Sequence, residues 1–286
     1  MSHSLELAAR ISLIVFVVLS LLSAGLSLSF KKVREPFTST RLVISALVAN
    51  FVLVPLAAYL ITKAIFLEQS LAVALLLLGT ASGAPMLPKL VEFARGNIGQ
   101  AVGLMALLMA GTIVTMPLVL PMLLPGVHTS AWPIARPLLS VIVPSLVAGL
   151  SLRAYRKALA ERLQPIFRVA SNMALAVVVL VAVLNNFSNV VRVGSLKAVV
   201  AGTVLFLISF GIGFALGGSD PGTRKVLALG TTQRSFSVAL LVAIEHFRES
   251  NVVNMLAILA LLALVTQVPA TLLWGTRIKH QNVNSK

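Results

Sequence analysis

Long apolar runs alternate with short polar connections along the whole chain. Each run provides the roughly 20 predominantly apolar residues that an α-helix needs to cross a bilayer. The pattern therefore predicts an all-α polytopic membrane protein with about nine transmembrane helices. The predicted spans are residues 8–30, 42–62, 70–94, 98–124, 131–152, 166–188, 197–217, 225–246 and 251–275.

Two of these spans are interrupted at matching places by polar, glycine-containing segments. Residues 79–85 read GTASGAP, and residues 230–235 read GTTQRS. Unwound backbone is tolerated at membrane depth only where it is buried in protein or lines a cavity, and paired interruptions indicate the binding site of a secondary transporter. We therefore predict two discontinuous helices, with breaks near residues 79–88 and 230–237.

The second break carries an arginine, Arg234. A charged side chain near the centre of a span costs roughly 3 kcal/mol even on lenient insertion scales, and such residues usually mark functional sites. Arg234 is therefore the first candidate functional residue of this chain.

Composition excludes a soluble globular domain. Only 11% of the residues are charged and 58% are hydrophobic, whereas about 25% of the residues of soluble domains are charged. The chain has no cysteine, which excludes disulfides and thiolate metal sites, and no nucleophile lies near a plausible base within a span. The sequence thus predicts no enzymatic activity, no catalytic residue, no metal site, no cofactor and no nucleic-acid partner.

Basic residues gather in alternate connections between the spans. These connections hold 15 of the 23 lysine and arginine residues, with clusters at residues 31–41 and 153–168. The positive-inside rule assigns such connections to the cytoplasm. We therefore expect a multi-pass protein of the plasma membrane (the inner membrane of a bacterium), with its N-terminus outside and a short C-terminal tail in the cytoplasm.

The segments that follow the two breaks indicate an internal repeat. Residues 92–97 read EFARGN and precede an apolar helix that reaches Thr112, while residues 245–251 read EHFRESN and precede one that reaches Thr266. The broken spans are the third and the eighth, so they cross the membrane in opposite directions, as in an inverted repeat. The predicted division is four helices in residues 1–130 and five in residues 131–286.

The same segments resemble the bile acid:sodium symporter superfamily. The resemblance rests on TASGAP at residues 80–85, EFARGN at 92–97, and QRS at 233–235 running on to EHF at 245–247. It implies a core domain with two crossing broken helices that moves against a panel domain. Some members have nine spans because the first repeat lacks its first helix, and the four-plus-five division of this chain fits that pattern.

The sequence departs from the sodium-binding members of this superfamily at the positions of their sodium ligands. The resemblance puts Leu87-Pro88 where those members have a Ser-Asn pair, Ala101 and Met105 at two hydroxyl positions, and either Gly230 or Leu229 at a glutamate position. None of these side chains provides the oxygen that a hard cation requires. We therefore expect transport that does not depend on sodium.

Arg234 is a candidate to replace the sodium ion that other members of the superfamily bind. In one interpretation its guanidinium occupies part of the vacated sodium site, donates hydrogen bonds to exposed carbonyls around residues 83–85, and offers its remaining donors to an anionic substrate. In the other it only neutralises helix C-terminal dipoles where the breaks cross. Lys89 either pairs with Glu92 or faces the substrate. The predicted substrate-binding residues are Arg234, Gln233, Thr232, Ser235, Ser82, Thr80 and Pro85.

These features together predict an alternating-access secondary transporter of a small organic anion, a bile-acid-like carboxylate or sulfonate. A sodium-coupled symporter of an organic anion is one alternative, and a channel or receptor that uses the same cavity is another. The predicted partners are the anion and the lipid bilayer, and a homo-oligomer is compatible with the sequence.

The basic-residue pattern makes a prediction about topology. In this cysteine-free chain, a cysteine placed at Ser39 or Gln281 should be protected from a membrane-impermeant thiol reagent in intact cells, whereas one at Ser130 should react. Labelling at Ser39 together with protection at Ser130 would show that the orientation is inverted.

Overall fold

The computed structural model describes residues 3–28, 39–124, 131–185, 193–247 and 251–283, and every regular element in these ranges is helical. The elements before residue 125 are α1 (His3–Ser27), α3 (Thr40–Val48), the π-helical turn η2 (Ala49–Leu53), α4 (Val54–Ala64), α5 (Gln69–Thr80), α6 (Leu87–Phe93) and α7 (Ile98–Leu123). Those after residue 130 are α8 (Ala131–Pro137), the π-helical turn η3 (Leu138–Ile142), α9 (Val143–Tyr155), α10 (Lys157–Asn185), α12 (Val193–Leu216), α13 (Pro221–Thr232), α14 (Phe236–His246) and α15 (Val252–Val283).

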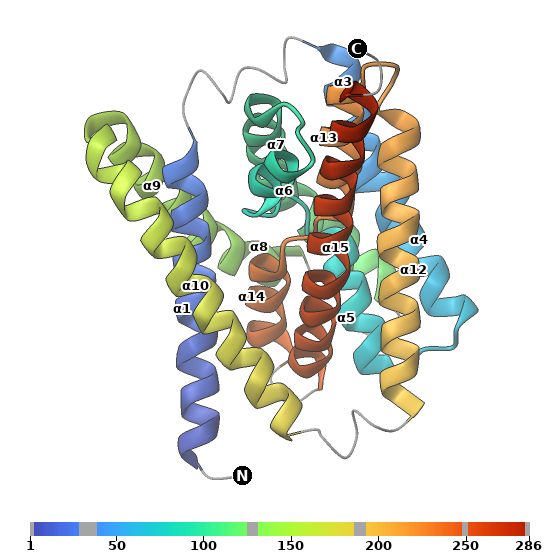
Figure 1. Ribbon diagram of the computed structural model, residues 1–286. Coiled ribbons are helices and arrows are strands. Elements are labelled where there is room, and N and C mark those ends of the chain that lie inside the picture. Colours follow the sequence, from blue (N-terminus) through green and yellow to red (C-terminus); the bar gives the residue numbers. More distant parts are fainter. Residues whose placement is uncertain (1–2, 29–38, 125–130, 186–192, 248–250, 284–286) are drawn as a thin grey trace.

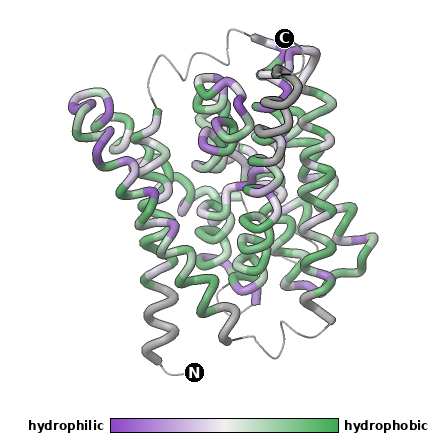
Figure 2. The backbone as a smooth tube through the Cα atoms, in the orientation of Figure 1, coloured by the Kyte–Doolittle hydropathy of each residue, from purple (hydrophilic) through white to green (hydrophobic). Residues whose placement is uncertain are grey.

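This architecture confirms the predicted fold class, an all-helical polytopic membrane protein. Seven helices of the described chain are long and apolar enough to span a membrane, and two shorter apolar helices, Ile11–Ser27 and Gln69–Thr80, lie at the first and third predicted spans. Figure 2 shows that the helices are hydrophobic along most of their length, with hydrophilic positions mainly near their ends.

Both breaks lie where the polar interruptions predict them. The helix ends at Thr80 and resumes at Leu87 in the first break, and it ends at Thr232 and resumes at Phe236 in the second. The two breaks touch, because the backbone N–H of Ser235 donates to the carbonyl of Ala81 at 3.0 Å. The division into repeats at residue 130 remains a prediction, and residues 125–130 lie outside the described chain.

Gly83 allows the first break to pack against α7. Its φ of +81° lies in the left-handed region that side chains disfavour, and a Cβ at this position would collide with the backbone of Met109. On the opposite side of α5, a Cβ at Gly79 would lie 2.6 Å from the Cβ of Ala58. Small residues therefore hold the broken helix close to its neighbours.

The second span widens by one residue at Asn50. The N–H of Val54 donates to the carbonyl of Ala49, five residues earlier, as in a π-helix. Pro55 follows directly; it has no N–H, and in a regular helix its ring would clash with the carbonyl four residues before it. The wider turn accommodates that ring and turns Asn50 into the protein, where it is fully buried.

Three helices, α1, α9 and α10, pack together as a group that we call the panel. Figure 1 shows this group at the left of the view, beside the helices that surround the two breaks. Gly25 and Gly149 let α1 and α9 approach closely, since a Cβ on Gly149 would lie 2.7 Å from the backbone nitrogen of Leu26. An ion pair of 3.2 Å between Arg153 and Glu161 joins the end of α9 to the start of α10.

Helix α10 begins at Lys157 rather than near residue 166. The hydropathy pattern missed this first part because it is charged, although lysine, glutamate and arginine are good helix formers outside the hydrocarbon. Ser130 lies outside the described residues, so Glu68, an exposed residue between α4 and α5 on the same predicted side, is the better labelling position.

Candidate functional site

Arg234 lies at the crossing of the two breaks, and only 1% of its surface is exposed. Its Nε donates to the carbonyl of Leu78 at 3.0 Å, and Nη2 donates to the carbonyl of Gly79. Its Nη1 donates to Oδ1 of Asn50 at 2.8 Å and to the carbonyl of Thr231 at 3.4 Å. A guanidinium has five N–H donors, so these four hydrogen bonds leave one donor for another partner.

The carbonyls that Arg234 contacts belong to the C-terminal ends of two half-helices. Leu78 and Gly79 lie in the last turn of α5, and Thr231 lies in the last turn of α13. Each helix C-terminus carries a partial charge of about −0.5, so two such ends together balance one positive charge. Arg234 thus neutralises both half-helices in a place where water is excluded.

This geometry corrects the predicted partners of Arg234. Its acceptors are not the carbonyls of residues 83–85 but those of Leu78, Gly79 and Thr231, together with the side chain of Asn50. The carbonyls before a break, where a helix ends, are the ones left without intrahelical partners. Residues 83–85 lie later in the break, nearer the start of α6.

Asn50 connects the two breaks from the neighbouring span. Its Oδ1 accepts hydrogen bonds from Arg234 and, at 3.3 Å, from the hydroxyl of Ser82, while its Nδ2 donates to the hydroxyl of Thr231 at 3.4 Å. A second link joins the first break to α7, because the backbone N–H of Ser82 donates to the hydroxyl of Thr112 at 3.0 Å. Asn50, Ser82, Thr112, Thr231 and Arg234 therefore satisfy most of one another's hydrogen bonds at the crossing.

A cavity of about 110 Å³ lies between the panel and the crossing. Helix α1 contributes Ser20 and Ser23, and α10 contributes Arg168 and Asn172. The opposite wall consists of residues 84–86 and Lys89 from the first broken helix, and Gln233, Arg234, Phe236 and Ser237 from the second. Both breaks and both helix groups therefore meet at one small space, which is lined by polar and charged side chains together with apolar ones.

Three cationic side chains border this cavity. Lys89 is partly exposed and forms an ion pair of 2.8 Å with Glu92, as one of the two predictions for it states, yet it also lines the cavity. Arg168 faces it from the panel and Arg234 from the second break. The amide Oε1 of Gln233 is buried, and no described group donates a hydrogen bond to it. The cations thus offer positive charge to an anion, whereas the Gln233 oxygen is an acceptor and could only bind a donor group of a ligand.

Residues 14–193 match the Sodium Bile acid symporter family. The chain belongs to this family. A curated relative from Arabidopsis thaliana, named "Probable sodium/metabolite cotransporter BASS1, chloroplastic", is 21% identical over 238 residues. That alignment covers 82% of this chain and 59% of the relative, so the chain spans less than two thirds of the relative's length. These matches confirm the resemblance on which the fold and the transporter class were predicted.

The family match includes the first break but ends before the second. Arg234 and its neighbours therefore lie outside residues 14–193.

Apolar side chains fill the positions that the family resemblance assigns to sodium ligands. Leu87, Ala101 and Met105 are fully buried. A Cβ at Gly230 would lie 2.8 Å from Cδ2 of Leu104 and 3.4 Å from Cδ2 of Leu87. Hydrocarbon therefore occupies the space around these positions, where a sodium site would need oxygen atoms.

The structure divides the seven predicted substrate-binding residues between three locations. Arg234, Gln233 and Pro85 line the cavity. Ser82, Thr80 and Ser235 are buried and bind other protein groups; for example, the hydroxyl of Thr80 donates back to the carbonyl of Leu76 at 2.9 Å. Thr232 lines a different cavity, between α12 and α15.

Sequence reasoning missed Asn50 and Arg168. Asn50 has a sequence signal, because it is the one amide within an otherwise apolar span and precedes a proline by five residues. The sequence pattern assigns Arg168 only to a cytoplasmic basic cluster. Only the packing of α10 against the breaks shows that its side chain borders the cavity.

Asn50 offers a test of this polar network. Asn50→Leu removes the shared acceptor of Arg234 and Ser82, and each buried donor left unsatisfied costs about 1–3 kcal/mol. We expect the thermal midpoint of the purified protein to fall clearly, and Asn50→Asp, which keeps the acceptor, to remain closer to wild type. Asn254→Leu, on the less buried Asn254 of α15, is the matched control; an equal loss in both leucine variants would argue against the network.

Proposed function

We propose that this protein is an alternating-access carrier of a small organic anion, a carboxylate or sulfonate. The observation that carries the proposal is the cavity between the panel and the crossing, which Lys89, Arg168 and Arg234 border. Membership of a symporter family supports the carrier class. The proposal involves no chemical change in the substrate.

The size of the cavity restricts the substrate in this conformation. Its volume of about 110 Å³ is below the about 300–1,000 Å³ of pockets for drug-sized ligands. A compact anion fits it better than a steroid-sized one. Substrate of either size would enter from one membrane face when the panel and the helices around the breaks separate.

Arg234 acts in this proposal as a tethered substitute for a coupling cation. In transporters with broken helices, unwound carbonyls and half-helix C-terminal ends coordinate the coupling ion. The guanidinium of Arg234 contacts two such ends, those of α5 and α13. Hydrogen bonds to a charged group contribute about 1.5–3 kcal/mol each, so four of them outweigh the roughly 3 kcal/mol insertion cost.

Substrate recognition is then shared between Arg234 and less buried groups. One N–H of Arg234 remains for the anion, while Arg168 and Lys89 provide the other contacts. Because Arg234 is covalently attached, we propose transport without sodium. The name of the plant relative, a sodium/metabolite cotransporter, favours the alternative of sodium coupling. Measuring uptake with potassium in place of sodium distinguishes sodium-coupled from sodium-independent transport.

The cellular setting follows from the same proposal. We place the protein in the plasma membrane, with its N-terminus outside and its C-terminus in the cytoplasm, on the evidence of the basic clusters in alternate connections. Tyr155, the exposed last residue of α9, begins such a connection and belongs in this proposal to the cytoplasmic side, opposite Glu68.

Arg168 provides the test of anion recognition. Arg168→Gln removes one cation from the cavity wall, and losing a hydrogen bond to a charged group should weaken affinity about ten- to a hundredfold. Saturable uptake of carboxylates and sulfonates by proteoliposomes, with counterflow, measures this effect. Arg162→Gln lowers the net charge equally from an exposed position on the same helix and should leave affinity near wild type. If Arg168→Gln and Arg162→Gln weaken affinity equally, Arg168 makes no direct contact with the anion. Uptake without saturation or counterflow would favour a channel.

Arg234 provides the test of the tethered cation. Arg234→Ala leaves the C-terminal ends of α5 and α13 without a cation, so the thermal midpoint should fall. Sodium or methylguanidinium should then restore stability, by about 2.7 kcal/mol at a hundredfold excess over the dissociation constant. The wild type and Lys89→Ala, a control that removes a cation from the cavity rim, should not respond to either ion, and wild-type uptake should be unchanged when potassium replaces sodium. If neither ion stabilises Arg234→Ala, or if sodium stabilises the wild type, then Arg234 does not take the place of a coupling cation.

A further inference from the structure

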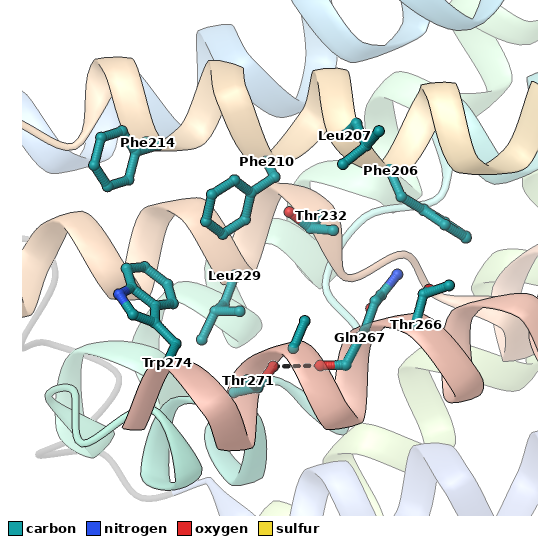
Figure 3. A pocket seen from close by; sticks show the side chains of 11 residues that line it. Phe206, Leu207, Phe210, Phe214, Leu229, Thr232, Thr266, Gln267, Thr271 and Trp274 are labelled. Carbon is teal, nitrogen blue, oxygen red and sulfur yellow. Dashed lines mark hydrogen bonds between the residues drawn. The ribbon is translucent and has the colours of Figure 1, made fainter. Parts of the chain in front are cut away.

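A second, larger cavity lies between α12, α13 and α15. Its volume is about 530 Å³, and Thr232 and Leu229 of α13 form one wall. Since the next residues, Gln233 and Arg234, line the substrate cavity, α13 separates two cavities. Figure 3 shows the larger one as an elongated space, with Phe214 and Trp274 at one end, Gln267 and Thr266 at the other, and Phe210 between them.

The aromatic end of this cavity is positively charged. The guanidinium of Arg224 lies 4.9 Å from the ring centre of Phe214, and Nζ of Lys225 lies 6.0 Å from that of Trp274. Both cations lie near the start of α13, where helices α12 and α13 meet the end of the span. Neither cation is among the residues that line the cavity, but both lie against aromatic rings that do, so the acidic group of a ligand that extends past these rings would meet them.

The opposite end contains a buried amide without a partner. Gln267 is 8% exposed, and among the described residues no group accepts a hydrogen bond from its Nε2. Figure 3 shows the side chain directed into the space between α12 and α15. Buried polar groups in native proteins are nearly always paired, so an unpaired one that faces a cavity indicates a missing ligand group.

The spacing of the two ends sets the length of that ligand. Gln267 and Trp274 lie on one continuous helix, seven residues apart in the chain, which corresponds to about 10 Å at 1.5 Å per residue. The walls between them are mostly apolar. Leu207, 66% exposed, and Phe214, 40% exposed, lie on the outward side of α12, so an amphipathic molecule dissolved in the bilayer can reach the cavity.

From these observations we infer a second binding site, for an amphipathic organic anion that carries a hydrogen-bonding oxygen at its far end. The acidic group lies between Arg224 and Lys225, the apolar body packs against the aromatic rings, and the terminal oxygen accepts from Gln267. This site is independent of the proposed transport function, although ligand there would contact the same half-helix, α13, that forms part of the substrate site.

Trp274 makes the site observable. In a Trp132→Phe background Trp274 is the only tryptophan, because the chain has two. We expect 2-bromodecanoate, whose bromine lies beside the acidic group and hence near Trp274, to quench its fluorescence saturably and 10-hydroxydecanoate to displace this probe. The hydroxy acid should bind about fivefold more tightly than decanoate, as one net hydrogen bond provides, and the 6-carbon and 14-carbon hydroxy acids should bind less well.

Three variants distinguish the site from ordinary lipid contact. Gln267→Leu should remove the preference for the hydroxy acid while keeping decanoate binding, and Arg224→Gln should weaken both acids about tenfold. Ala270→Phe should fill the cavity and abolish saturable quenching, whereas Val265→Phe, at an exposed position of the same helix, should not. Non-saturable quenching, quenching unchanged by Ala270→Phe, or displacement only by phosphatidylglycerol would overturn the inference.

Discussion

The guanidinium of Arg234 holds together two half-helices that end inside the membrane. Without water, the C-terminal carbonyls of α5 and α13 need donors from the protein, and Arg234 donates to both ends. The remaining polar contacts at the crossing are arranged around this charge. Asn50 receives one of its hydrogen bonds, and the π-helical turn before Pro55 is what brings Asn50 into reach.

A tethered cation has different consequences from a mobile one. A bound ion can leave, so its gradient can drive the transport cycle, whereas a covalently attached guanidinium can only stabilise the crossing and attract the substrate. In the carrier that we propose, the substrate itself would have to favour a movement of the panel against the broken helices, because a ligand shifts a conformational equilibrium only by its differential affinity for the two states. The cations that border the cavity from both sides, Arg168 on the panel and Lys89 on α6, are placed to provide such a difference.

Helix α13 lies between the substrate cavity and the larger cavity beside α12 and α15. Consecutive residues at its end face opposite sides, with Thr232 in the larger cavity and Gln233 in the smaller. A ligand between α12 and α15 would therefore press on the half-helix whose C-terminus Arg234 neutralises. Close packing reinforces this link, since a Cβ on Gly213 of α12 would lie 2.6 Å from the carbonyl of Leu227.

The sequence by itself determined the number and order of the apolar helices, the two breaks and the presence of a charge, Arg234, in the second break. Each of these follows from local physics: the length of apolar segments, the need to satisfy unwound backbone, and the cost of a charge in hydrocarbon. The symporter-family resemblance could likewise be read from the segments around the breaks. The hydropathy pattern did not predict helix where a helix continues through charged residues beyond an apolar span, as at the start of α10.

Only the tertiary structure decided which groups meet. The carbonyls of Leu78 and Gly79 carry no sequence signal, because every residue has one; their role depends on where α5 ends and on which helix crosses it. The same holds for Thr232, which points away from the cavity that its neighbours line, and for Arg168, which faces the breaks only because the panel packs against them. Contacts between segments more than a hundred residues apart depend on helix rotation and crossing, which no local pattern of residues specifies.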